Sequence, residues 1–189
     1  MKSKLAFGWI IFLAISFSVS AQKNKIRFHS INTFGLAGGE SKASTAFQSV
    51  NGIQFSNWFS GIGVGVDYYR YKTLPLFIDG RYFFGDDKNG FIYGDLGYNF
   101  PMKNKLEKRF TYSYDLYRFS GGIYTDFGIG FQTPLCKSSF LLFSLGYSYK
   151  KLETKGKLNE CGVIGPCWSN YVNYEFNLNR MILKAGLVF

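Results

Sequence analysis

The sequence is poor in the residues on which most catalytic and metal sites depend. Its 189 residues include a single His and three Cys, which argues against a dedicated zinc site or a redox enzyme with a CxxC motif. Pro is scarce, with four residues, and a mean hydropathy near zero excludes a helical membrane protein with several spans. Aromatic residues are abundant instead: 21 Phe and 14 Tyr favour strands, and 47% apolar content excludes a disordered chain.

The first 21 residues are typical of a secretory signal peptide. Lys2 and Lys4 supply the positive start, the run from Leu5 to Val19 is almost wholly apolar, and Val19-Ser20-Ala21 matches the small-residue cleavage pattern. The alternative is a retained N-terminal anchor helix, but a run of about 15 residues is short for a membrane span. We therefore expect residues 22–189 to form one exported domain, in a compartment that permits disulfides.

Alternation of apolar and small or polar residues, with a period of two, predicts β-strands after the signal. Six stretches alternate clearly, at 61–68, 76–83, 92–99, 119–131, 141–149 and 180–189. Two weaker stretches precede them, near 26–36 and 47–56, which gives eight strands in total.

The connectors between these strands differ in length in a regular way. The first, fifth and seventh are long, at 37–45, 100–117 and 150–173, whereas 57–60, 85–90 and 133–138 are short and rich in turn residues. Only the third, 72–75, breaks the pattern. Alternate connectors of an up-and-down barrel lie on opposite rims, so the pattern predicts an eight-stranded antiparallel up-and-down transmembrane β-barrel with long outer loops.

The two faces of the strands indicate which side meets lipid. A soluble lipocalin-like barrel would turn its apolar face inward, whereas a membrane barrel turns it outward. The non-apolar face predicts a network of charges in the lumen: Asp67, Asp79, Arg81, Asp95, Asp126, Arg180 and Lys184. Six Gly residues on that face would make room for long side chains: Gly63, Gly65, Gly97, Gly128, Gly130 and Gly146.

Aromatic residues also gather near the strand ends, as in the two girdles of a membrane barrel. Near the long connectors stand Tyr68, Tyr69, Tyr71, Tyr98, Phe100, Tyr147 and Tyr149. Near the short turns stand Trp58, Phe59, Phe83 and Phe84. We therefore expect the apolar face to meet lipid.

The C-terminal residues and the strand pattern together resemble a known family. The segment 184–189 ends in Phe189 with apolar residues at alternate preceding positions, and the string 74–82 is similar to a recurrent strand of small barrels. Over residues 22–189 the chain resembles the eight-stranded transmembrane domains of outer membrane proteins A, X and W. The resemblance implies an outer-membrane location of the Gram-negative type. It also implies that Gly186, Leu187 and Phe189 form the signal read by the barrel-assembly machinery.

Two sets of residues suggest chemistry beyond a scaffold. His29 beside Ser30 suggests a lipid-modifying hydrolase, but adjacent strand residues point to opposite faces, so these two cannot form a catalytic pair directly. The lumen charges suggest a polar pore or relay, or else they pair with one another and plug a narrow barrel.

Basic residues and cysteines mark the long connectors. The basic residues are Lys103, Lys105, Lys108 and Arg109 in the fifth, and Lys150, Lys151, Lys155 and Lys157 in the seventh. They would bind lipopolysaccharide phosphates or simply form a solvated loop surface; nucleic acid is not an expected partner outside the cell. Gly and Pro between Cys161 and Cys167 favour a local disulfide, with Cys136 left over.

The sequence thus predicts a monomeric outer-membrane barrel without cofactor or metal, whose role is structural or interactive through its loops. A small-solute channel is the alternative, and a lipid-modifying enzyme a more distant one.

Overall fold

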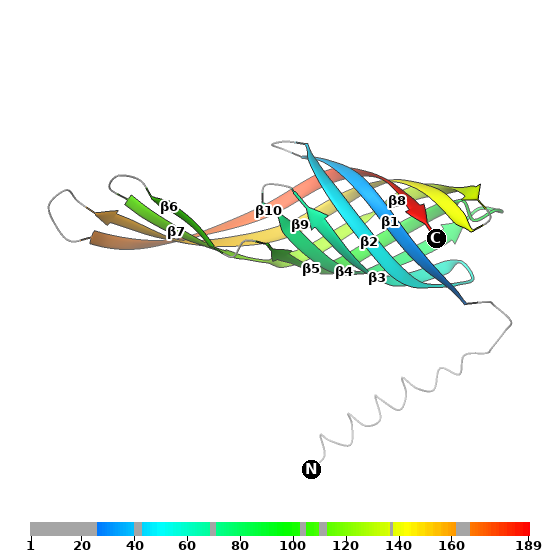
Figure 1. The fold of residues 1–189 in the computed structure, drawn as a ribbon, viewed down its shortest axis with the longest axis horizontal. Helices are drawn as coiled ribbons and strands as arrows, with labels where there is room; N and C mark the ends of the chain where they lie inside the picture. The colour runs from blue at the N-terminus through cyan, green and yellow to red at the C-terminus, as the bar shows by residue number, and fades with distance from the viewer. Residues whose placement is uncertain are drawn as a thin grey trace, which may run out of the picture.

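The chain forms an all-β structure in a computed structural model that describes residues 26–39, 43–68, 71–102, 105–109, 113–136, 138–161 and 167–189 (Figure 1). The expected signal peptide, residues 1–21, lies outside these ranges, as do Tyr69 and Lys103. Among the described residues, no helix is both long and apolar enough to cross a membrane. The strands are β1 (Arg27–Gly39), β2 (Ser44–Phe55), β3 (Trp58–Asp67), β4 (Thr73–Phe84), β5 (Gly90–Pro101), β6 (Lys105–Arg109), β7 (Ser113–Ser120), β8 (Gly122–Cys136), β9 (Ser139–Cys161) and β10 (Cys167–Val188).

Eight of these strands close into an antiparallel barrel, in the order β1, β2, β3, β4, β5, β8, β9, β10 and back to β1. A row of Cα partners followed once round the ring starts at His29 in β1 and returns to β1 at Gly39, ten residues farther along. With a rise of ~3.3 Å per residue and a strand spacing of ~4.8 Å, this stagger gives a strand tilt of about 40° and a backbone radius of about 8 Å. Such a barrel is narrow enough for side chains to fill it.

The apolar side chains face outward and the small or charged ones inward. On β3, Ile62 is 66% exposed and Val64 is exposed, while Gly63, Gly65 and Asp67 are buried. Exposed apolar side chains recur on all eight barrel strands, for example Leu36, Phe47, Ile78, Leu96, Ile129, Leu145 and Leu183. An apolar belt of this kind is stable only against lipid, so the barrel is a transmembrane one and not a lipocalin-like one.

One rim carries only short connections. Ser56 and Asn57 join β2 to β3, residues 85–89 join β4 to β5, and the chain ends there with Phe189 beside Ser30. Ser56 adopts a positive φ of 55°, as the tight two-residue turn requires. We call this the turn rim. At the opposite rim the first and third connections are also short, since four residues separate β1 from β2 and five separate β3 from β4. The long first connector predicted for 37–45 is therefore wrong.

The two other long connectors of the prediction are largely strand. β9 and β10 run on for 23 and 22 residues, and β6 and β7 form a hairpin that pairs with the far part of β9. The far parts of β10 (Cys167–Phe176) and β9 (152–161), together with β7 and β6, make a four-stranded sheet that we call the extension. Figure 1 shows it projecting well beyond the barrel. The prediction missed it because neither face is lipid-exposed, so its strands lack the apolar alternation of the barrel.

The predicted strand 119–131 is in fact two strands. It breaks at Gly121, where β7 ends and β8 begins. Phe119 accordingly does not share the lipid face with Phe127 but is buried, with its ring centroid 4.6 Å from that of Tyr71. The girdle assignment also needs correction, because Phe59 and Phe83 are buried inside the barrel, whereas Trp58 and Phe84 are exposed.

Candidate functional site

The lumen is packed with side chains along its length, and the part next to the turn rim is apolar. A single buried cluster fills the interior from the turn rim toward the extension, with rings that contact one another at centroid distances of 5.8 Å for Phe83 and Phe91 and 6.3 Å for Phe91 and Tyr93. The cluster contains Ile31, Val50, Phe59, Phe77, Phe83, Phe91, Tyr93, Tyr124, Leu142 and Val188. Glycine on the neighbouring strands makes this packing possible: a Cβ at Gly130 would overlap the ring of Phe91, and one at Gly146 would overlap the Tyr93 hydroxyl.

The first ion pair lies against the rings of this cluster. The guanidinium of Arg81 donates to both carboxylate oxygens of Asp79, with Nε to Oδ1 at 2.9 Å and Nη2 to Oδ2 at 2.8 Å. Its face lies over the rings of Phe59, Phe91 and Tyr93, with the guanidinium carbon 5.5–5.8 Å from each centroid. The bidentate contact and the aromatic faces hold this buried cation in place and compensate for its lost hydration.

Three carboxylates stand side by side across the next strands. Asp79, Asp95 and Asp126 are successive Cα partners on β4, β5 and β8. Like charges directly opposite one another repel, so the row needs cations. Lys184 supplies one: its Nζ lies 2.7 Å from Asp126 Oδ2 and 3.8 Å from Asp95 Oδ2.

Hydroxyl groups complete the layer that Asp79, Asp95, Asp126 and Lys184 form in the middle of the lumen. The hydroxyls of Tyr93 and Tyr124 donate to the Asp126 carboxylate at 3.0 and 3.1 Å. Gln48 Nε2 donates to the Tyr124 hydroxyl oxygen at 2.7 Å, from the opposite side of the ring of strands. A network that spans the lumen in this way ties its walls together.

A second charge cluster lies nearer the extension. Asp67 Oδ2 forms an ion pair with Arg180, whose Nη1 lies 2.6 Å away, and accepts a hydrogen bond from Lys150 Nζ at 3.1 Å. Lys150 also donates to Thr73 Oγ1, and Arg180 to Ser148 Oγ. All seven charges predicted for the lumen are therefore buried inside the barrel, in two clusters, and Lys150 joins them.

Lys150 corrects the sequence interpretation. The sequence predicts it among the exposed basic residues of the seventh connector, yet it is fully buried. The alternation of the strand could have revealed its position. Ser144, Gly146 and Ser148 precede it at steps of two, and alternate residues of β9 share the inward face. With Lys150 included, four buried acids face four buried bases among the described residues of the lumen.

Apolar contacts cover these charges on the side of the extension. Leu152 and Leu178 are buried just beyond Lys150 and Arg180, and Tyr71 and Phe176 pack against them. Tyr71 comes from the β3–β4 connection and touches Phe119 of β7, so it bridges two sides of the barrel mouth. Side chains thus occupy the lumen from the turn rim to the base of the extension.

Of the other predicted basic residues, Lys103 lies outside the described residues, Lys151 lies on β9 just before the extension, and the rest lie on strands of the extension. Lys105, Lys108 and Arg109 belong to β6, while Lys155 and Lys157 lie on β9. Lys151 Nζ lies 3.2 Å from Glu175 and 3.3 Å from Glu153 on the outer surface. The hydrogen bonds that the Lys151 ammonium donates to Glu175 and Glu153 raise the pKa of Lys151. This charged cluster indicates that the outer face is in water at and beyond Lys151.

His29 lines a small cavity of about 150 Å³ at the turn rim, together with Gln54, Asp87 and Gln132. No Ser lines this cavity, and the Ser30 hydroxyl oxygen is instead an acceptor for Asn32 Nδ2 at 3.5 Å on the other face of β1. The described residues contain no group of three or more His, Cys, Asp and Glu side chains that could hold a metal ion.

The cysteines and the C-terminal residues occupy separate places. Cys167 is disulfide-bonded, its Cα partner in the ladder is Cys161, and Cys136 is free and exposed at the turn rim. The side chain of Cys161 lies outside the described part. Phe189 exchanges two backbone hydrogen bonds with Ser30, at 2.9 and 3.0 Å, and Leu187 and Gly186 pair with Asn32 and Thr33. The residues of the predicted assembly signal therefore help to close the barrel.

Comparison with known proteins identifies the fold. No family model matches the sequence, and no curated protein matches it. Among solved structures, the chain is similar to outer membrane protein AlkL, determined in lipid bilayers, with 14% identity over 90% of this chain and 92% of that one and a TM-score of 0.52. It also matches the N-terminal β-barrel domain of OprF from Pseudomonas aeruginosa (10% identity, 87% and 100% covered, TM-score 0.48) and Neisserial surface protein A (13% identity, 86% and 95% covered, TM-score 0.48). The likeness to AlkL carries the assignment, and at such identity it concerns the fold alone. In fold, the chain is a small eight-stranded β-barrel of the outer-membrane type.

Proposed function

We propose that this protein is an outer-membrane barrel with a closed lumen, and that it acts as a surface-interaction protein through its extension. The fold, the lipid-facing apolar belt and the secretory signal expected at residues 1–21 support the location. The barrel anchors the molecule, and the sheet beyond it supplies the surface offered to partners. No catalytic step is part of this role.

The filled lumen favours an anchor over a small-solute channel. Within a backbone radius of about 8 Å, inward side chains from opposite walls meet. Here they meet as ion pairs and hydrogen bonds, such as Arg81 with Asp79, Lys184 with Asp126 and Arg180 with Asp67. Opening a pore would require these buried charges to separate, which is unfavourable unless water replaces every contact.

The observation that carries the proposal is the aromatic edge of the extension. In the described ladders the far part of β10 pairs with β9 alone, because β1 pairs only with residues from Arg180 onward. This strand, which is open along one edge, carries Trp168 and Tyr171, which are 72% and 78% exposed, and the exposed Tyr174. Large aromatic side chains in water beside an open strand edge are typical of a protein-binding surface, where a partner adds a strand and covers the rings.

Adhesion of whole cells tests this role. Cells that carry the wild type would be compared with cells that carry Trp168→Ser/Tyr171→Ser, on surfaces coated with protein and on bare surfaces. We expect the double variant to lower adhesion to protein-coated surfaces several-fold. A matched control is Phe28→Ser, which removes an exposed ring at the turn rim. Heat-dependent gel mobility confirms that each variant is folded. Equal adhesion of the wild type, the double variant and cells without the protein would contradict the proposal.

A further inference from the structure

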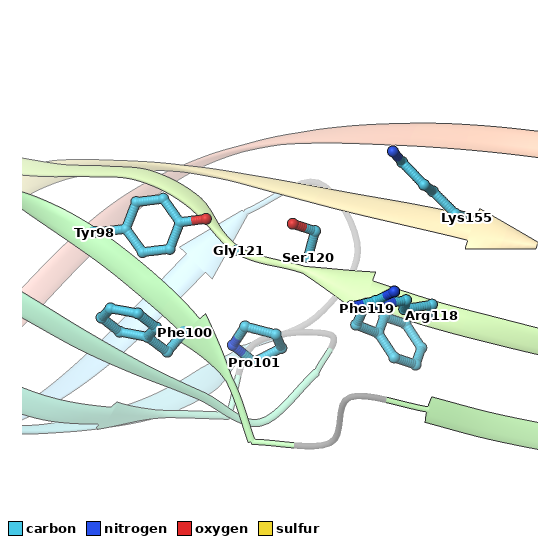
Figure 2. Close-up of a pocket in the computed structure, with 8 residues that line it drawn as sticks. All are labelled: Tyr98, Phe100, Pro101, Arg118, Phe119, Ser120, Gly121 and Lys155. Carbon is cyan, nitrogen blue, oxygen red and sulfur yellow. The ribbon is translucent and has the colours of Figure 1, made fainter.

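A pocket of about 670 Å³ opens on the outside of the barrel, where the wall divides. β5 pairs with β8 as far as Asn99 and Gly122, then continues along β4 to Pro101, while β7 follows β9 away from the barrel. Figure 2 shows Tyr98, Phe100 and Pro101 of β5 on one side of the resulting notch, and Ser120, Phe119 and Arg118 on the other. The separation of two strands therefore creates a recess in an otherwise continuous wall.

Gly121 allows the chain to turn tightly at the floor of the notch. A Cβ at this position would overlap the carbonyl oxygen of Asn99 and lie 2.7 Å from the Tyr98 ring. Only Gly fits this approach without a backbone shift. Pro101 suits the other wall, because beyond Asn99 the β5 strand has no further partner on its β8 side in the described ladders.

The lower part of the notch is aromatic and continues the lipid-facing belt. Tyr98 and Phe100 are exposed on the same face of β5 as Leu96, and their ring centroids lie 4.9 Å apart. Rings in this position belong to the boundary between the apolar core of a bilayer and its headgroups. An acyl chain that lies along the barrel wall would pass over them.

The upper part of the notch is basic. Arg118 and Lys155 are direct Cα partners on β7 and β9, so two cations share one face at the closest cross-strand distance. The Cα of Lys105 is the next in the same row. Such a pair is repulsive unless an anion lies between its members.

The residues that line the notch do not supply that anion. None of the eight is acidic. Glu153, two residues before Lys155 on the same face of β9, is engaged with Lys151 at 3.3 Å. In Figure 2 Lys155 lies farther toward the extension than Tyr98 and Phe100. The headgroups of the outer leaflet would lie at that end of the barrel.

We propose that this notch binds a phosphate-bearing glycolipid of the outer leaflet, with its phosphate between Arg118 and Lys155 and an acyl chain against Tyr98 and Phe100. Arg and Lys are both suited to phosphate oxygens, and the aromatic floor discriminates a lipid from a soluble phosphate. The site is separate from the aromatic edge of β10, so it does not depend on the interaction role of the extension. It would fix the rotation and depth of the barrel relative to the leaflet.

Native mass spectrometry of the folded protein released from detergent micelles tests the site. Diphosphorylated lipid A is titrated into the wild type, into Arg118→Gln/Lys155→Gln, and into Arg27→Gln/Lys88→Gln as a matched control. The control removes two cations at the turn rim. We expect one tightly retained lipid on the wild type and on the control, and about tenfold or greater weakening in the Arg118/Lys155 variant. The single variant Lys155→Gln should give an intermediate affinity.

Two probes distinguish the ligand class. Lipid A without its phosphates should bind the wild type about as weakly as phosphorylated lipid A binds the Arg118/Lys155 variant. Inorganic phosphate at the concentration of the lipid should not displace it. Equal binding by the wild type and the Arg118/Lys155 variant would overturn the proposal. Equal weakening in both double variants would overturn it as well, and so would full displacement by inorganic phosphate.

Discussion

The ammonium group of Lys150 lies 3.1 Å from Asp67 Oδ2, and both side chains are buried inside the barrel. The two residues are far apart in the sequence and on strands β9 and β3, which are not neighbours in the ring. Their contact therefore crosses the lumen. Arg180 lies 2.6 Å from the same oxygen. The three charged groups together close the lumen on the side of the extension.

Removing this buried cation should destabilise the fold. Lys150→Met leaves four buried acids against three bases, although Arg180 still neutralises Asp67 in part. We expect the free energy of unfolding to fall by about 3 kcal/mol, which is the lower range for breaking a buried pair. Urea unfolding in lipid vesicles, followed by Trp fluorescence, measures the change.

The matched control is the next residue along the chain. Lys151→Met removes an exposed lysine whose pairs with Glu153 and Glu175 are in water, so stability should hardly change. Equal effects of the two substitutions would show that Lys150 does not occupy the lumen.

Two glycines of β5 provide a test of the packed interior. Gly97 faces the lumen, where a Cβ would lie 2.5 Å from Phe77 Cα, whereas Gly94 faces lipid with nothing within 4 Å. Gly97→Ala should destabilise the barrel by about 1–3 kcal/mol because of overpacking. Gly94→Ala should be neutral or slightly stabilising. The same urea titration compares them, and a barrel with an open lumen would tolerate both equally.

The lipid-facing belt predicts a dependence on depth. Val64→Arg places a cation near the middle of the apolar face of β3 and should cost about 2–4 kcal/mol. Ser60→Arg lies on the same face but four residues nearer the turn rim, where the cost falls to about 0–1 kcal/mol. Folding yield into vesicles, judged by heat-dependent gel mobility, reports the difference. If both variants fold as well as the wild type, the apolar face does not meet lipid.

The cysteine pairing is a prediction of the sequence that labelling can decide. In the folded, unreduced protein a thiol reagent should modify Cys136 alone, with Cys161 and Cys167 bonded to each other. Reduction should cost about 2 kcal/mol at most, because the enclosed loop is short, and it should leave the barrel folded. Peptide mapping that finds Cys136 joined to either of the other two would contradict the topology, since Cys136 lies at the turn rim.

The sequence predicts the barrel wall well because lipid and a packed lumen impose opposite demands on alternate residues. The stretch 61–68 shows this directly, with Ile62 and Val64 outside and Gly63 and Gly65 inside. Where both faces meet water, as in β9 beyond Leu152 and β10 before Phe176, this alternation is absent and the pattern predicts loops. The packing of Phe59 and Phe83 inside the barrel was missed because an aromatic residue at a strand end fits a girdle and a core equally well.

The charged interior was predictable in outline but not in its pairing. The alternation along each strand places Asp79, Asp95 and Asp126 inside. Only the register between the strands shows that the three residues are direct neighbours. Likewise, strand alternation alone predicts that Lys150 faces the lumen. The lysines that follow it in the sequence instead suggest an exposed segment. The notch between β5 and β7 has no counterpart in the sequence pattern, because it arises from the break at Gly121.

Conductance in planar bilayers tests the closed lumen most directly. The purified, folded protein is inserted into a bilayer in concentrated KCl, with a general porin as the positive control for detecting single channels. The paired charges and the apolar layers on either side of them predict that the current stays at the baseline at all moderate voltages, with no discrete steps. Reproducible single-channel steps from the wild-type protein, absent from an identically prepared sample without it, would contradict the closed barrel and favour the channel.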